Sequence, residues 1–150
     1  MIEKPTVLIL GAGASVPYGF PSGRGLKQII LKSLGTSGIM NLRQIMKDLG
    51  FEPSIVESFR NDLFYSGWSS VDAFLEYRPK FIEIGKLAIA LLLFPFELED
   101  KIFKEKDSEN SWYHHLFEKL KTNFDSFDKN KISIITFNYD RSVEHFLFTH

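Results

Sequence analysis

The chain has 150 residues, a net charge of −1 and no cysteine. This length suits one ordinary domain, and the balanced charge argues against direct nucleic-acid binding, which needs a clustered positive surface. The lack of cysteine excludes a disulfide framework, a thiolate catalyst and a cysteine-based zinc site.

Two apolar runs predict buried strands. The first is Thr6–Leu10 and the second is residues 132–137. A continuous apolar run is typical of a strand that is covered on both faces, as in a parallel sheet between helices. We therefore expect an α/β fold in which the two runs are parallel neighbours in one sheet and helices cover both of its faces.

The segment between the two runs has apolar residues at helical spacing. This spacing predicts helices over about 24–34 and 41–49, helices that begin near Ser54 and Ser70, a long apolar helix that ends at Leu93, and helices over 112–120 and 141–148. Residues 54–57 form a capping box, and Ser111 or Asn110 is a candidate cap for the helix at 112–120. The charge-rich residues 101–110 are expected to form a solvated loop.

The most hydrophobic stretch, residues 87–96, is too short to span a bilayer, which takes about 20 residues. It contains Pro95 and is flanked by Lys86 and Glu97, so we expect a buried helix. The first residues also lack the pattern of a signal peptide. These observations predict no membrane association and a cytoplasmic location.

Two strands do not make a stable open sheet by themselves. The sequence thus predicts a sheet that is incomplete within these 150 residues. We expect the chain to be the N-terminal part of a single, longer domain.

A glycine-rich loop follows the first predicted strand. Gly11, Gly13 and Ser15 stand where a strand leads into a helix, and glycines there let a phosphate approach main-chain amides at the helix start. Val16 occupies the third glycine position of the dehydrogenase fingerprint, and no acidic residue follows about 20 residues later, which disfavours a dehydrogenase. A tight strand-to-helix turn is an equally open interpretation of the two glycines.

Polar residues follow the second predicted strand. Asn138 and Asp140 come directly after it, and ligands of open α/β sheets bind beyond the carboxyl ends of the strands. An amide and a carboxylate at this edge are able to hydrogen-bond a ribose or a carboxamide. The alternative interpretation is that both residues cap the following helix.

These motifs resemble those of the sirtuin-like (silent-information-regulator-like) NAD-binding family. Residues 11–15 and 19–23 resemble its nucleotide loop, and residues 136–140 are similar to its Thr-Gln-Asn-Ile-Asp signature. Residues 70–75 and 84–86 resemble the helical insert of a bacterial subgroup found in phage-defence proteins. The resemblance implies a Rossmann-like parallel sheet with a large helical insert over about 36–128.

The resemblance also implies roles for single residues. The loop would hold the pyrophosphate and adjoining ribose of NAD, a second loop would cover the cofactor, and the end of the second strand would face the nicotinamide ribose and carboxamide. The implied cofactor-binding residues are Gly11, Ala12, Gly13, Ala14, Ser15, Pro21, Ser22, Arg24, Thr136 and Asn138, and the implied catalytic residues are Asn138 and Asp140. Arg24 is the candidate phosphate partner, because a guanidinium matches phosphate oxygens.

Two departures from the family shape the expected function. The family's four-cysteine zinc module is absent, which disfavours protein deacylation, and the chain contains no His-Gly dipeptide to supply the catalytic histidine. We expect an NAD-binding domain of the NAD-hydrolase type that is inactive in this form. The first alternative is a non-catalytic domain that senses NAD or ADP-ribose. The second is an interaction domain, in which the aromatic helical insert is a surface for a protein partner and the glycine-rich loop is only structural. The expected protein partners are a second copy of the chain or a downstream effector domain.

Overall fold

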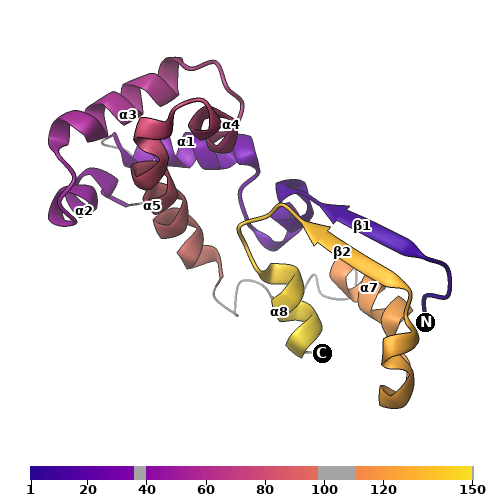
Figure 1. Ribbon diagram of the computed structural model, residues 1–150. Helices are drawn as coiled ribbons and strands as arrows, with labels where there is room; N and C mark the ends of the chain where they lie inside the picture. Colours follow the sequence, from indigo (N-terminus) through magenta and orange to yellow (C-terminus); the bar gives the residue numbers. More distant parts are fainter. Residues whose placement is uncertain (36–39, 98–110, 150) are drawn as a thin grey trace. The chain divides into compact units, whose positions relative to one another are not determined.

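The computed structural model describes residues 1–35, 40–97 and 111–149. The chain divides into two compact units, which are labelled by their elements in Figure 1. The sheet unit comprises Met1–Phe20 and Phe96–His150, and the helical unit comprises Pro21–Pro95. The predicted solvated loop at 101–110 lies outside the described residues.

The sheet unit is built on a parallel pair of strands, β1 (Thr6–Leu10) and β2 (Ile132–Thr136). The register runs from Thr6 opposite Ile132 to Leu10 opposite Thr136. Both predicted strands and their parallel pairing are confirmed, so the described part of the chain is a mixed α/β structure with a small two-stranded sheet. The unit also contains η1 (Ala12–Tyr18), α7 (Trp112–Leu120), η4 (Phe124–Lys129) and α8 (Ser142–Thr149).

One face of this sheet is exposed. Val7 and Ile9 of β1 are 58% and 68% exposed, and Ile135 of β2 is 47% exposed, whereas the alternate strand residues are half-buried. Successive side chains of a strand point to opposite faces, and α7 and α8 lie on one side of the sheet (Figure 1). The expectation of cover on both faces was therefore wrong for the described residues, although the strands themselves are as predicted.

The helical unit packs around aromatic side chains. Its elements are α1 (Gly23–Ser33), α2 (Leu42–Asp48), α3 (Pro53–Tyr65), α4 (Val71–Glu76), η2 (Pro79–Phe81) and α5 (Ile82–Leu93), with η3 (Phe94–Phe96) after α5. The ring of Phe59 in α3 lies 6.1 Å from that of Phe74 and 5.6 Å from that of Phe81. All three side chains are buried, so this cluster is the centre of the unit's own core.

The helical segment predicted over 36–128 is divided between the two units. The helices up to Pro95 pack with α1, which precedes the predicted insert, whereas α7 and η4 belong to the sheet unit. Tyr113 and Leu120 of α7 are buried there, and α7 packs against α8. Helical spacing in a sequence identifies a helix, but it does not show which neighbours cover the apolar face of that helix.

Two of the three predicted serine caps are confirmed. The side chains of Ser70 and Ser111 accept hydrogen bonds from the amides of Ala73 and His114, as caps of α4 and α7. The capping box at 54–57 is wrong: α3 begins at Pro53, and its N-cap residue, Glu52, makes no side-chain cap. Proline is favoured at the first helical position, which places the start upstream of Ser54.

The apolar stretch at 87–96 forms the end of α5 and η3. Ala88, Ile89 and Leu92 are buried, as expected, but Phe94 is 71% exposed. Among the described residues, no helix combines the length and the apolar character that crossing a membrane requires.

Candidate functional site

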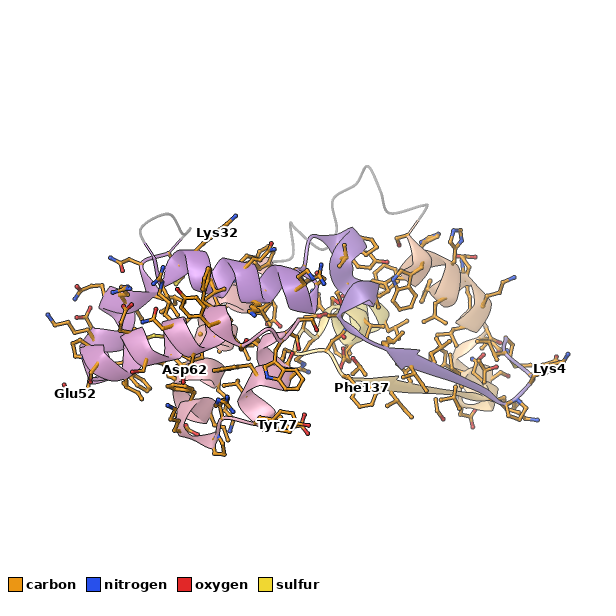
Figure 2. All side chains as sticks on the ribbon, turned by 90° about the horizontal axis from the view of Figure 1, so that it is seen from above. Lys4, Lys32, Glu52, Asp62, Tyr77 and Phe137 are labelled. Carbon is orange, nitrogen blue, oxygen red and sulfur yellow. The ribbon has the colours of Figure 1, made fainter. Side chains whose placement is uncertain are left out.

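Both strands of the sheet end at one edge and lead into polar segments. The amide of Phe137 donates to the carbonyl oxygen of Leu10 at 2.9 Å, which extends the pairing of the strands past Thr136. The side chain of Phe137, labelled in Figure 2, is 76% exposed. Because ligands of parallel sheets bind beyond the carboxyl ends of the strands, this edge is the candidate functional site.

The glycine-rich loop forms the start of η1. Gly11 precedes η1 with φ −115° and ψ 176°, and the amide of Ala14 donates to the carbonyl oxygen of Gly11 at 2.8 Å. Neither Gly11 nor Gly13 has a positive φ, and a Cβ added at either position would meet no atom within 4 Å. The fold therefore requires glycine at neither position, and the space above both residues is open.

Aromatic residues anchor η1 to α7. The indole nitrogen Nε1 of Trp112 donates to the carbonyl oxygen of Ala14 at 2.8 Å. The amide of Tyr113 donates to the hydroxyl of Tyr18 at 3.0 Å, and the two tyrosine rings stack with their centroids 3.9 Å apart. These contacts hold the glycine-rich loop in one place against α7.

A buried network joins this loop to the end of β2. The hydroxyl of Ser15 donates to Oδ1 of Asp140 at 2.9 Å. The same oxygen accepts hydrogen bonds from the hydroxyl of Ser142 and, at 3.2 Å, from its amide. Ser15 is fully buried, and Asp140 and Ser142 are 8% and 1% exposed. One carboxylate oxygen thus ties η1, the end of β2 and the start of α8 together.

Tyr113 closes one end of the network. Its hydroxyl lies 2.5 Å from Oγ of Ser142. Burial raises the pKa of Tyr113 to about 12, so the phenol remains protonated and able to donate at neutral pH.

Asn138 forms the other end of the network. Its side-chain nitrogen Nδ2 donates to Oγ of Ser15 at 3.0 Å, and its backbone amide donates to Oγ1 of Thr136 at 3.1 Å. The side-chain oxygen Oδ1 is buried and has no hydrogen-bond partner among the described residues. The side-chain amide of Asn138 is therefore held by its nitrogen, and its oxygen is an acceptor that is not used.

The structure brings together three of the predicted site residues, Ser15, Asn138 and Asp140. The alternative interpretation, that Asn138 and Asp140 both cap the following helix, holds in part: Oδ1 of Asp140 accepts a hydrogen bond from the amide of Ser142 at the start of α8, whereas the side chain of Asn138 bonds Ser15 instead. Thr136 uses its hydroxyl oxygen to hold the backbone of Asn138.

The remaining predicted residues lie in the loop and in the helical unit. Gly11 and Gly13 are exposed, and Ala12 and Ala14 are half-buried. Pro21, Ser22 and Arg24 belong to the helical unit, where the hydroxyl of Ser22 caps α1 by accepting from the amide of Gly25 at 3.2 Å. Their contact with a nucleotide stays a prediction.

A hollow of about 390 Å³ adjoins the network at Ser142. It is lined by Glu97, Arg141, Ser142, Glu144, His145 and Phe148. The described residues contain no group of three or more side chains that could hold a metal ion.

Sequence reasoning missed the residues that support the site. Tyr18, Trp112, Tyr113 and Ser142 hold η1 and Asp140, yet none of them was expected to do so. Tyr113 precedes Phe117 and Leu120 by four and seven residues, so helical spacing alone could have placed it on the buried face of α7. The contact of Ser142 with Asp140 is local, because the two residues are two positions apart, whereas its contact with Tyr113, 29 positions away, had no such signal.

No protein-family model, curated protein or solved structure matches this chain.

Proposed function

We propose that this chain forms the nucleotide-binding edge of a sirtuin-like, Rossmann-like domain, which binds NAD or ADP-ribose beyond the carboxyl ends of β1 and β2. The observation that carries the proposal is the open space over Gly11 and Gly13. Neither glycine is explained by a positive φ or by crowding within the fold. Close approach of a ligand to the backbone accounts for both of them.

The backbone at this point has the right chemistry for a phosphate. The amides of Ala12 and Gly13 lie at the start of η1 and donate no hydrogen bond to the described residues. Free amides at the start of a helical segment favour an anion such as the pyrophosphate of NAD. The phosphate contact then comes from the backbone, because the hydroxyl of Ser15 is already committed to Asp140.

The proposed reaction is cleavage of the bond between nicotinamide and ribose. Nicotinamide leaves with the bonding electron pair, positive charge develops at the anomeric carbon, and water then attacks that carbon and loses a proton. The protein's contribution would be to position the ribose and to stabilise the developing charge. In this proposal Asn138 contacts the nucleotide, and Asp140 is linked to Asn138 through the hydroxyl of Ser15.

Binding without cleavage is the second candidate function. It is favoured by the sequence, which contains no His-Gly dipeptide. It is also favoured by the network around Asp140, because its members among the described residues are hydroxyl, amide and carboxylate groups and do not include the imidazole of a catalytic histidine. An open pocket also weakens electrostatic contacts, because water remains within it. For these 150 residues we expect weak binding of NAD and no release of nicotinamide.

Calorimetry with NAD and ADP-ribose tests the binding site. Gly13→Val should abolish the binding heat while the far-UV circular dichroism stays native, because the new side chain fills only open space. Unchanged affinity in the folded variant would reject the phosphate site. Chromatographic assay of nicotinamide then separates the two functions: release by this chain would show that it contains a complete catalytic set.

A further inference from the structure

We propose that Asp140 is a positioning residue that fixes the side-chain amide of Asn138 with its carbonyl oxygen free, so that the site selects a ligand group that donates a hydrogen bond. This inference rests on the proposed nucleotide site for the identity of the ligand. The orientation of the amide rests on the hydrogen bonds of the chain alone.

The first step is the direction of the bonds at Asp140. A carboxylate only accepts hydrogen bonds. The hydroxyls of Ser15 and Ser142 both contact its Oδ1, so each must give its single proton to that oxygen. Ser15 and Ser142 also lie 3.3 Å from each other, but neither has a second proton to donate across that gap.

The second step is the consequence for Asn138. Because the proton of Ser15 is used, its Oγ is left as an acceptor only. The atom of Asn138 that lies 3.0 Å away must therefore be the donating Nδ2, and Oδ1 must point elsewhere. The two ends of an asparagine amide have nearly the same shape, and the surrounding network normally decides between them. Here the charge of Asp140 decides.

The third step closes the network at its far end. The proton of Ser142 is used on Asp140, so the hydroxyl of Tyr113 is the donor in its contact with Ser142. Burial keeps this phenol protonated, because it raises the pKa of Tyr113. Tyr113 thus donates to the oxygen of Ser142, and Ser142 keeps donating its own proton to Asp140. The hydrogen bond from Ser15 to Asp140 is therefore unchanged by the contact with Tyr113.

The fourth step concerns the ligand. Oδ1 of Asn138 is an unpaired acceptor that surrounding atoms cover, so a ligand hydroxyl or amide N–H that displaces this cover gains a hydrogen bond there. A ligand group that only accepts would leave Oδ1 unpaired and would bind less tightly. In NAD this donor is a ribose hydroxyl or the carboxamide NH₂, and in ADP-ribose it is a ribose hydroxyl.

The orientation of the amide is tested without any ligand, by hydrogen exchange of the Asn138 side chain in ¹⁵N NMR spectra. In the native chain one proton on Nδ2 should exchange slowly, because it is bonded to Ser15. Asp140→Asn and Ser15→Ala should both remove this protection in a chain with native circular dichroism. Thr149→Ala, which removes an exposed side-chain hydrogen bond of α8 outside the network, should keep it. Equal protection in the native chain, Asp140→Asn and Ser15→Ala would overturn the inference.

The ligand is tested by calorimetry with three probes: NAD, nicotinic acid adenine dinucleotide and ADP-ribose. If the carboxamide is the donor, NAD binds about tenfold more tightly than both of the others. If a ribose hydroxyl is the donor, all three bind alike, and a deoxyribose analogue of ADP-ribose loses about tenfold. Equal binding of all four compounds would overturn the selection of a donor. The two experiments can also disagree. If the variants change the hydrogen exchange of the Asn138 side chain as expected but no probe binds, the amide orientation is established and the proposed nucleotide is rejected.

Discussion

At Gly19 the backbone has φ 87° and ψ −2°, a left-handed conformation that ends η1 and that glycine adopts with little strain. Gly13 lies within η1 and has no positive φ. We expect Gly19→Ala to lower the free energy of unfolding by about 1–2 kcal/mol, because an alanine there is strained. Gly13→Ala should leave this free energy unchanged or raise it by up to about 1 kcal/mol, because alanine suits a helical segment better. Chemical denaturation measures both changes.

The same pair of variants separates folding from binding. Gly13→Ala should weaken the binding of ADP-ribose, whereas a loss of stability equal to that of Gly19→Ala would mean that the fold itself requires Gly13.

Tyr113 predicts a loss of stability in alkaline solution. Its pKa is raised to about 12 in the folded chain, against about 10 for an exposed tyrosine, so the unfolded chain loses this proton first. The raised pKa contributes about 3 kcal/mol to the free energy of unfolding. This stabilisation is fully present below pH 10 and is lost as the pH rises from about 10 to about 12. Tyr113→Phe should flatten this decline in denaturation curves. Tyr18 is present in both chains, so equal declines would show that Tyr113 titrates normally.

At this scale the sequence predicted Ser15, Asn138 and Asp140 as one site, because the motifs place them after neighbouring parallel strands. It could not predict that the site is held by Tyr113 and Ser142. The contact between these two residues depends on how α7 and α8 pack, and a hydroxyl has no spacing signal of its own.

At the scale of single elements, two serines of the helical unit make a matched pair. The hydroxyl of Ser70 caps α4, whereas Ser54 lies inside the first turn of α3, which begins at Pro53. Ser70→Ala should therefore lower the free energy of unfolding by about 1 kcal/mol, and Ser54→Ala should change it by less than about 0.5 kcal/mol. Denaturation with urea gives both values. A larger effect at Ser54 would restore the capping box that the sequence suggests.

The strands show where prediction of an element stops. The apolar runs predicted the existence, direction and pairing of β1 and β2, because local hydrophobicity and the crossover rules suffice for these. They did not predict that Val7 and Ile9 are exposed. Whether a sheet face is covered depends on residues far along the chain. The same holds for α7, which packs in the sheet unit and not with the helices that precede it in the sequence.

At the scale of the whole molecule, each unit has its own core and its own tryptophan. Trp68 lies in the helical unit and Trp112 in the sheet unit. Phe59→Ala removes the centre of the aromatic cluster and should lower the stability of the helical unit by about 3–5 kcal/mol. In a chain labelled with fluorotryptophan, the ¹⁹F signal of Trp68 should lose its native form at a lower urea concentration. The signal of Trp112 should keep its midpoint, and a common shift of both signals would show one cooperative unit.

A nucleotide that binds where β1 and β2 end would lie against the glycine-rich loop and Asn138. A ¹⁵N NMR titration of the native chain with ADP-ribose detects such binding even when it is weak, because the resonances of the residues involved still shift. We expect shifts for the amides of residues 11–15 and for the side-chain amide of Asn138, with saturation at one common affinity. A titration that leaves these resonances unmoved, or that moves only those around Arg141 and Glu144 in the hollow beside α8, would contradict this expectation.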